Sequence, residues 1–325
     1  MRTLQVNEAL REALRQEMES DSRVFAFGED VGVYGGLDGV TKGLQEKFGA
    51  ERVFDTPIAE AGFAGMGVGA ALMGMRPVVE LQFTGLVTVA MDAIVNSAAK
   101  ARYVNDGLMG APIVFRTIHF GGGNVYTAQA LEAWFAHVPG LKVVAPSTPH
   151  DCKGLLISSI RDPDPVVFIE HTDLYKITGP VPEESYAIPM GEAAVRREGD
   201  DVTIVTWLNM APIVEEAARE LADDGVSAEV IDLRTLVPFD RETVVRSVRK
   251  TGRLVIVHEA VRRGGFGAEV AATVANSEAF PHLKAPIVRV ANVGAPVPHS
   301  PDLSVHVLPG KDDVLEGVRR VVGYK

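Results

Sequence analysis

The sequence contains a single cysteine, Cys152, among its 325 residues. An internal disulfide and a cysteine-based zinc cluster are therefore excluded. Cys152 lies between Asp151 and Lys153, where it is either a nucleophile or, as is several times more common, a small packing side chain. A lone reduced cysteine suits a reducing compartment, and we expect a cytoplasmic protein.

Long apolar runs and basic runs are also missing. No apolar stretch reaches the roughly 18 residues that a membrane-spanning helix needs. The net charge of −11 argues against a nucleic-acid-binding protein, and no run of five basic residues occurs. Residues 1–19 predict an amphipathic helix that carries acids, so we expect neither a secretory signal nor an acid-poor transit peptide. We therefore expect neither nucleic acid nor membrane as a partner.

Several common catalytic motifs are absent as well. The chain has no GxSxG nucleophile elbow, which disfavours a serine hydrolase of that type. Its eight histidines lie far apart and form no HExxH zinc motif. The glycine run 121–123 is neither a GxGxxG fingerprint nor a P-loop, since no P-loop lysine follows it.

Strand and helix patterns alternate along the whole chain, and 46% of its residues are hydrophobic. This alternation predicts an α/β protein with two doubly wound, mostly parallel-sheet domains. Residues 177–190 are rich in proline and glutamate without a sustained period, and we interpret them as a linker between domains at 1–176 and 191–325. We expect the first element to be a helix and residues 87–103 to form one helix with Asp92, Asn96 and Lys100 on one face.

The stretch 53–79 combines a strand, a turn carrying Glu60, and a helix with glycines at 62, 65, 67 and 69. Each glycine costs a helix about 1 kcal/mol relative to alanine, which is tolerable where another backbone must come close. Glu60 is either a functional carboxylate at that close contact or a residue that merely stabilises the positive end of the helix. Spacing alone slightly favours the second interpretation.

Other polar residues lie at predicted strand ends. Glu29 and Asp30 follow the strand 23–27, in the place where open parallel sheets hold their ligands. A solvated acidic turn is an equally good interpretation. Gln82, in the strand 78–83, is a further cofactor-binding candidate. His258 and Glu259 are either an acid/base pair or, more commonly, a structural histidine beside its neighbour.

Several longer segments together carry a resemblance to a known family. They are residues 28–32 (GEDVG), 55–63 (DTPIAEAGF), 96–100 (NSAAK), 131–144 (LEAWFAHVPGLKVV), 232–240 (DLRTLVPFD) and 264–269 (GGFGAE). With these segments in this order, the chain resembles the beta subunits of thiamine diphosphate-dependent 2-oxo acid dehydrogenases, the pyruvate, branched-chain and acetoin group.

The resemblance implies a pyrimidine-binding domain followed by a transketolase C-terminal-type domain. It also implies thiamine diphosphate at the interface with an alpha subunit, which would hold the diphosphate through Mg²⁺ in an α2β2 heterotetramer. Glu60 matches the family glutamate that exchanges a proton with the aminopyrimidine ring and so prepares the thiazolium carbon for attack on a 2-oxo acid. Relatives also have a monovalent-cation site, such as K⁺, which would match Ile160 and Asp162.

This sequence departs from the family pattern at three places. Thr127 stands where relatives have the histidine that assists acyl transfer to lipoate, and Tyr126 and His119 are candidates to reach into that gap. Leu86 stands where many relatives place an aromatic ring against the aminopyrimidine, a contact worth about 0.5–1.5 kcal/mol. Residues 207–208 read Trp-Leu where relatives tend to have Tyr-Gly.

We therefore expect oxidative decarboxylation of a 2-oxo acid of the pyruvate or branched-chain type, with acyl transfer to a lipoyl group of an acyltransferase core. One alternative is a diverged carboligase or transketolase-like subunit that does not use lipoate, which Thr127 mildly favours. Another is a non-catalytic scaffold subunit, against which the retained Glu60 argues.

Overall fold

The computed structural model describes residues 2–122 and 124–324 and forms two compact units. Unit 1 is Met1–Gly121 with Tyr126–Met190, and unit 2 is Gly122–Val125 with Gly191–Lys325. Each unit has a mostly parallel sheet with helices on its faces, so the predicted α/β class with two doubly wound domains is confirmed. No helix in the described part of the chain is long and apolar enough to cross a membrane.

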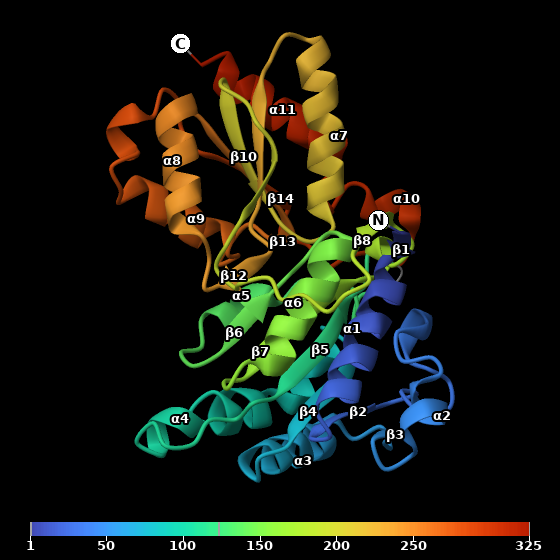
Figure 1. Ribbon diagram of the computed structural model, residues 1–325. Helices are drawn as coiled ribbons and strands as arrows, with labels where there is room; N and C mark the ends of the chain where they lie inside the picture. Colours follow the sequence, from blue (N-terminus) through green and yellow to red (C-terminus); the bar gives the residue numbers. More distant parts are fainter. Residues whose placement is uncertain (1, 123, 325) are drawn as a thin grey trace. The chain divides into compact units, whose positions relative to one another are not determined.

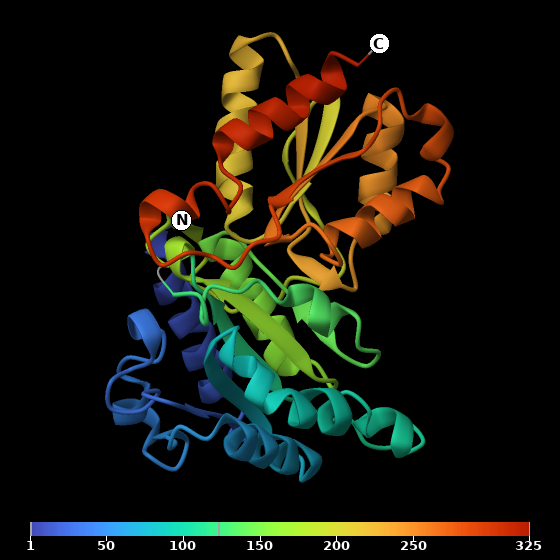
Figure 2. The same cartoon turned by 180° about the vertical axis from the view of Figure 1, so that it is seen from behind.

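Six strands of unit 1 are hydrogen-bonded in the order β6-β7-β5-β4-β2-β3, and all of these pairs are parallel. The elements of this unit are β1 (Arg2–Gln5), α1 (Val6–Ser20), β2 (Val24–Gly28), α2 (Leu44–Phe48), β3 (Val53–Asp55), α3 (Glu60–Leu72), β4 (Arg76–Phe83), α4 (Ala101–Val104), β5 (Val114–His119), α5 (Glu132–Ala136), β6 (Lys142–Val144), α6 (Pro149–Arg161), β7 (Val166–His171) and β8 (Thr178–Val181). Helices α1 and α6 lie side by side on one face of the sheet (Figure 1), and the segment leading to α4 lies on the other (Figure 2).

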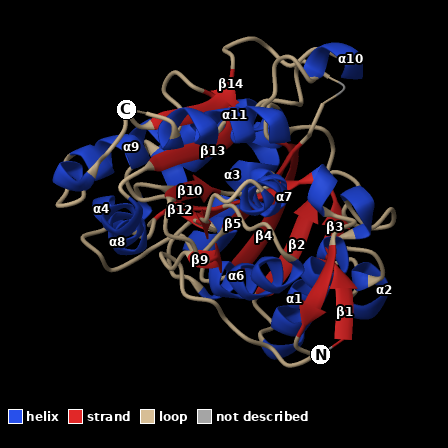
Figure 3. Cartoon of the chain, turned by 90° about the horizontal axis from the view of Figure 1, so that it is seen from above, coloured by secondary structure: helices blue, strands red, loops and turns tan. Residues whose placement is uncertain are grey.

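The first element is the strand β1 rather than the helix that the sequence pattern predicts. Helix α1 begins only at Val6, and its buried residues, among them Ala9, Leu10 and Leu14, recur with the predicted helical spacing. Residues Arg2–Gln5 instead pair antiparallel with β8 (Figure 3). Pairing with a strand far away in sequence therefore determines the structure of residues 2–5, although their local pattern is helical.

The segment 177–190, predicted to be a linker, packs on unit 1. Its strand β8 pairs with β1, and Lys153 of α6 anchors the residues that follow. The Lys153 side chain is 0% exposed, and its Nζ donates to Glu12 Oε1 (2.6 Å) and to the carbonyl oxygens of Pro182 (2.8 Å) and Glu184 (2.9 Å). A buried ammonium group needs such partners, so this lysine fixes a segment that has no regular pattern of its own.

The predicted helix 87–103 is divided into three pieces. They are a 3₁₀ turn at Leu86–Ala90, a π-helix at Asp92–Ala98 and the short α4. The predicted polar row is nevertheless present, since Asn96 Nδ2 donates to Asp92 Oδ1 (2.7 Å) and Lys100 Nζ donates to Asn96 Oδ1 (2.8 Å). A π-helix has more than four residues per turn, so side chains four apart stay on nearly the same face.

Of the four glycines in α3, Gly67 is where the helix lies closest to the sheet. A Cβ at Gly67 would lie 2.8 Å from Val79 Cγ2 and 2.9 Å from Ile113 Cδ1. A Cβ at Gly65 or Gly69 would meet nothing within 4 Å. At Gly67 the helix therefore packs tightly against side chains of its own sheet and not against another backbone, while Gly65 and Gly69 are exposed.

We expect the Gly67→Ala and Gly65→Ala variants to change stability in opposite directions. At Gly67 the added methyl group overpacks the contact with the sheet, which costs about 1–3 kcal/mol and outweighs the gain of about 1 kcal/mol in helix propensity. At Gly65 only the gain remains. Urea unfolding of both variants measures the difference, and a Gly67→Ala protein as stable as Gly65→Ala would contradict this packing.

Unit 2 has a five-stranded sheet in the order β14-β13-β10-β11-β9, in which only the edge strand β9 is antiparallel. Its elements are β9 (Ala194–Arg197), β10 (Val202–Thr206), α7 (Met210–Asp223), β11 (Ala228–Asp232), β12 (Thr235–Val237), α8 (Arg241–Thr251), β13 (Leu254–Val261), α9 (Gly267–Ala275), β14 (Val288–Asn292), α10 (Pro301–Ser304) and α11 (Lys311–Val322). Buried residues of α7 and α11 pack on β10, β13 and β14 and form an apolar core.

His258 of β13 is part of the packing of unit 2. Its ring stacks on Trp207 with 5.1 Å between centroids and 9° between planes, and its side chain is fully buried. Burial, together with the charge of Arg289, lowers the pKa of His258 to about 4, so the ring is neutral at pH 7. These contacts favour the structural interpretation of His258. Leu208, which follows Trp207, has φ +53°, a backbone conformation in which glycine is unstrained.

Candidate functional site

The carboxyl ends of β2, β3 and β4 bring the predicted cofactor-side residues of unit 1 together. Strand β2 pairs in parallel with both β3 and β4, so the residues after each strand meet at one edge of the sheet. Glu29 follows β2, Glu60 follows β3, and Gln82 lies near the end of β4. The Gln82 Nε2 atom donates a hydrogen bond to the carbonyl oxygen of Glu29 (3.4 Å).

Glu60 is the first residue of α3 and is 9% exposed. Its position in the first turn places the carboxylate near the positive end of the helix. The following residues, Ala61 and Gly62, are small and exposed. Glu60 is therefore a largely buried carboxyl group at the first turn of α3, followed by two small exposed residues.

Glu29 faces the same region with an unsatisfied oxygen. Its Oε1 atom is buried and has no hydrogen-bond partner among the described residues. Burial first, and then the negative charges of Glu60 and Asp30, raise the pKa of the Glu29 carboxyl above its usual range. An orphaned buried acceptor beside a second carboxylate fits a ligand that offers hydrogen-bond donors, as the aminopyrimidine group of thiamine diphosphate does.

The raised pKa of Glu29 predicts a pH-dependent gain in stability for Glu29→Gln. A carboxyl with a raised pKa in the folded state binds its proton more tightly there than in the unfolded chain. Stability is therefore lost as the pH rises from the ordinary glutamate pKa, about 4.3, through the raised value. Urea unfolding should show Glu29→Gln to be more stable than wild type at pH 8 and equal to it near pH 4. A difference that does not change with pH would contradict this assignment.

Two residues that the sequence analysis did not single out hold the loop after Glu29. Asp55 accepts from the backbone N–H groups of Gly32 (2.6 Å) and Val33 (3.4 Å). Glu80 Oε1 accepts from the N–H of Leu37 (3.4 Å). Both carboxylates come from strands next to β2, so the sheet itself fixes where the chain leaves β2 and thereby where Glu29 lies.

Glu80 also belongs to a buried ionic network inside the sheet. Arg116 Nη1 donates to Glu80 Oε2 (2.6 Å), and its Nε and Nη2 atoms donate to the two oxygens of Glu170 (2.6 and 2.8 Å). Tyr175 donates from its hydroxyl to Glu170 Oε2 (2.8 Å). The sequence could have indicated this network, because each of its members is a charged residue within an otherwise apolar strand: Glu80 in β4, Arg116 in β5 and Glu170 in β7. Glu80 and Arg116 are directly opposite each other in the β4–β5 pair.

Two positions that depart from the family pattern, Leu86 and Thr127, lie close to one another, together with Tyr126. A Cβ at Gly85 would lie 1.8 Å from the carbonyl oxygen of Tyr126 and 3.5 Å from Thr127 Cα, so the loop carrying both residues lies against the backbone next to Leu86. The Tyr126 side chain is 72% exposed. His119 is buried in β5, and its ring packs edge-to-face on that of His171 with 5.1 Å between centroids.

The oxygens of the expected monovalent-cation site already have protein donors. Arg76 Nη1 donates to the carbonyl oxygens of Ile160 (2.7 Å) and Asp162 (3.1 Å). The Asp162 carboxylate pairs with Lys142 Nζ at 2.6 Å. A guanidinium and an ammonium group thus supply the positive charge here. These residues do not fit a site for a cation such as K⁺.

Comparison with known families agrees with this geometry. The transketolase pyrimidine-binding domain matches residues 2–178, and the transketolase C-terminal domain matches residues 191–314. A solved structure described as a split-gene transketolase, inactive beta4 tetramer, has the same fold, with a TM-score of 0.80 at 24% identity over 98% of both chains. The two units are therefore of the transketolase type.

Sequence relatives define the family more narrowly. The pyruvate dehydrogenase E1 component subunit beta of Bacillus subtilis is 48% identical over 98% of both chains, and the 2-oxoisovalerate dehydrogenase subunit beta of that organism is 44% identical over the same shares. The mitochondrial pyruvate dehydrogenase E1 subunit beta-1 of Arabidopsis thaliana is 47% identical over 97% of this chain and 88% of its own. The chain belongs to the family of beta subunits of thiamine diphosphate-dependent 2-oxo acid dehydrogenases.

Proposed function

We propose that this chain, together with an alpha subunit, catalyses oxidative decarboxylation of a 2-oxo acid of the pyruvate or branched-chain type and transfers the acyl group to a lipoyl group. The observation that carries this proposal is the pair of carboxylates, Glu60 and Glu29, at the carboxyl edge of the first sheet. Identities of 44–48% to beta subunits of both substrate types support it without selecting between them.

Thiamine diphosphate supplies an electron sink for decarboxylation when it is bound. Glu60 would accept and return a proton at a ring nitrogen of its aminopyrimidine, since its carboxylate is held at the helix end. Glu29 would accept a hydrogen bond through the buried Oε1 atom that has no partner in the described structure. Gln82 would hold the backbone of Glu29 in place through the hydrogen bond from its Nε2 atom to the Glu29 carbonyl oxygen. Leu86 would pack against the aminopyrimidine ring.

The substrate side would be formed by the loop that carries Tyr126 and Thr127. Its contact with Gly85 places it next to Leu86. Thr127 offers a hydroxyl group, which can donate and accept a hydrogen bond but does not titrate near neutral pH as histidine does. Acyl transfer would then rely on a histidine of another chain or on Tyr126. His119 would support the loop from the strand end, where it packs on His171.

The assembly that we propose is an α2β2 heterotetramer that binds a lipoyl acyltransferase core. Residues 1–176 would act as the pyrimidine-binding domain and residues 191–325 as the C-terminal domain. Mg²⁺ and the diphosphate would be held by the alpha subunit. We propose a reducing compartment such as the cytoplasm, because Cys152 is buried and forms no disulfide; the Arabidopsis thaliana relative is named mitochondrial.

The proposal is tested by assaying the chain co-purified with its alpha subunit. Decarboxylation of pyruvate and of 2-oxoisovalerate is measured with an artificial electron acceptor, and acylation is measured with a lipoyl domain. We expect turnover with both acceptors. Turnover with the artificial acceptor alone would favour the carboligase alternative, and a Thr127→His variant that then gains lipoyl acylation would locate the cause. Failure of the assembled pair to bind thiamine diphosphate would favour the scaffold alternative.

A further inference from the structure

A pocket in unit 2 lies where the neighbouring parallel strands β13 and β14 end, and we call it the strand-end pocket. The loops after two such strands meet at the carboxyl edge of the sheet, where open α/β sheets hold their ligands. The pocket has a volume of about 570 Å³, within the range of about 300–1,000 Å³ that is typical of small-molecule sites. Of the eight described residues that line it, three are arginines, Arg262, Arg263 and Arg289, and none is acidic.

The three guanidinium groups carry positive charge without a counterion among the described residues. Arg262 and Arg263 are exposed, and Arg289 is half-buried. Arg319 of α11 is different, because it forms an ion pair with Asp224 at 2.9 Å. Arg289 Nη1 donates to the carbonyl oxygen of Arg262 (2.8 Å), a neutral acceptor that leaves the charge uncompensated. One pocket thus gathers three uncompensated positive charges in a chain whose net charge is −11.

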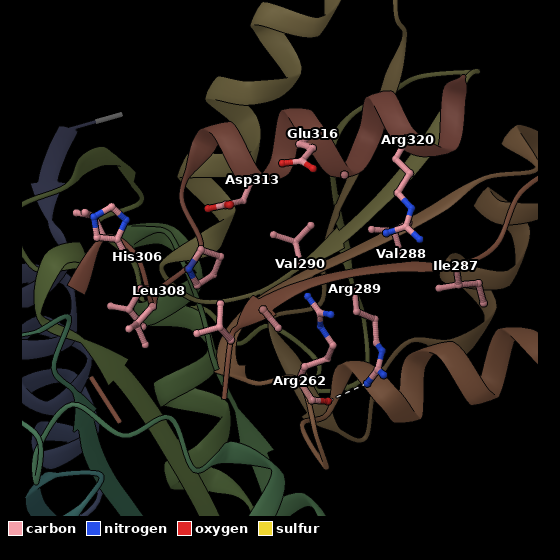
Figure 4. A pocket seen from close by; sticks show the side chains of 16 residues that line it. Arg262, Ile287, Val288, Arg289, Val290, His306, Leu308, Asp313, Glu316 and Arg320 are labelled. Carbon is pink, nitrogen blue, oxygen red and sulfur yellow. Dashed lines mark hydrogen bonds between the residues drawn. The ribbon is translucent and has the colours of Figure 1, made fainter. Parts of the chain in front are cut away.

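Acidic side chains of unit 2 line a different pocket, between β14 and α11. Figure 4 shows Asp313 and Glu316 projecting from α11 there, and it shows the hydrogen bond that joins Arg289 to Arg262. Val290 faces α11, and side chains alternate across a strand, so Arg289 lies on the opposite face of the sheet. Arg262 and Arg289 border both pockets, but within the described structure they form no ion pair with these two acids, which do not line the strand-end pocket.

The charge of these arginines also acts on the buried ring of His258. Burial first, and then the positive charge of Arg289, lower the pKa of His258, and the charge of Arg262 adds to this effect. The negative charge of Glu259 acts in the opposite direction but has a smaller effect than Arg289. The buried carboxylate beside the strand ends therefore does not outweigh the arginines.

The walls of the strand-end pocket are fixed before any ligand binds. The side chain of Asn292 is buried, and its Oδ1 atom accepts from the backbone N–H groups of Gly294 (2.8 Å) and Ala295 (3.2 Å). The N–H group of Arg262 donates to the carbonyl oxygen of Asn292 (3.3 Å), which joins the loop after β13 to the loop after β14. Binding of a ligand here costs little ordering of the backbone.

We propose that the strand-end pocket binds a small molecule that carries a diphosphate group, whose oxygens contact Arg262, Arg263 and Arg289. Guanidinium groups form bidentate, charge-assisted hydrogen bonds with phosphate oxygens, and three of them match the charge of a diphosphate better than that of a single carboxylate. Helix α9 begins at Gly267, next to Ala268 of the pocket lining, so its positive end adds to the attraction. A nucleic acid is disfavoured as the ligand by the net charge of −11.

Isothermal titration calorimetry with the full chain at low ionic strength tests this proposal. The probes are pyrophosphate and ADP, and we expect both to bind with a Kd below about 1 mM. Arg262→Ala, Arg263→Ala and Arg289→Ala should each weaken binding about tenfold, as loss of one charge-assisted hydrogen bond predicts. Arg249→Ala is the matched control, because Arg249 is exposed at the end of α8 and does not line the pocket. Its affinity should equal that of wild type.

Further ligands separate the sources of the diphosphate group. Tighter binding of ADP than of pyrophosphate would support a nucleotide as the ligand, and equal binding would support recognition of the diphosphate alone. Citrate bound as tightly as pyrophosphate would overturn the assigned class of ligand. Failure of both probes to bind, or equal affinities of wild type and the three pocket variants, would overturn the site itself. The pocket shares no residue with the Glu60 site, and the titration measures no turnover, so its outcome is independent of the proposed function.

Discussion

Replacing Glu60 by glutamine is expected to lower 2-oxo acid decarboxylation by the assembled enzyme about 10²–10⁴-fold, the range for loss of a positioned acid–base group. Glutamine keeps the shape of the side chain and its hydrogen-bonding capacity but can neither accept nor return a proton. Cofactor affinity should therefore change much less than kcat. The assay is steady-state turnover with an artificial electron acceptor at saturating thiamine diphosphate.

The control for this variant is Glu51→Gln, which removes a carboxylate from an exposed position outside the edge of the sheet. It should keep full turnover. If Glu60→Gln retained more than about a tenth of the wild-type kcat, the Glu60 carboxylate would not be the proton carrier. The mechanism proposed for this chain would then be wrong.

Replacing Arg116 by methionine is expected to destabilise the protein by about 3–5 kcal/mol, the range for breaking a buried ion pair by removing one partner. Arg116, Glu80 and Glu170 are all at most 3% exposed. Without the guanidinium group, two buried carboxyl groups lose their counterion. Burial already raises the pKa of Glu80, so protonation would offset only part of the loss.

The measurement is urea unfolding of Arg116→Met beside Arg15→Met. Arg15 forms exposed pairs within α1, with Glu19 at 3.1 Å, and its removal should cost at most about 0.5 kcal/mol. A triple variant with Glu80→Gln, Arg116→Met and Glu170→Met should recover much of the lost stability, because no charge remains buried. Equal stability of the two single variants would show that the network does not hold the sheet.

The fold class was predictable because apolar residues recur along the sequence with the spacings typical of buried strands and of helices. Buried strands such as β10 (VTIVT) and β13 (LVIVHEAV) are rich in β-branched apolar residues, and α1 has its buried residues at helical spacing. The strand β1 and the packed segment 177–190 were not predictable in the same way. They depend on each other and on Lys153, through contacts between residues about 30 to 180 positions apart, and a local sequence pattern carries no information on such contacts.

The candidate site was predictable in part. Residues at the ends of neighbouring parallel strands must meet, so Glu29, Glu60 and Gln82 could be grouped before the structure was available. The proximity of Leu86 to Tyr126 and Thr127 could not be derived, since it depends on a close approach to Gly85 by a loop more than 40 residues away. The hydrogen bonds that Arg76 donates to the carbonyl oxygens of Ile160 and Asp162 could not be derived from the sequence either.

The proposed function depends on one claim, that Glu60, at the carboxyl edge of the unit 1 sheet, activates thiamine diphosphate. Hydrogen–deuterium exchange at the thiazolium C2 atom tests this claim most directly, because it isolates activation from substrate choice and from the acceptor. The account predicts rapid exchange on the assembled wild-type enzyme and exchange near the rate of free cofactor for Glu60→Gln. Equally rapid exchange in the two proteins would contradict it.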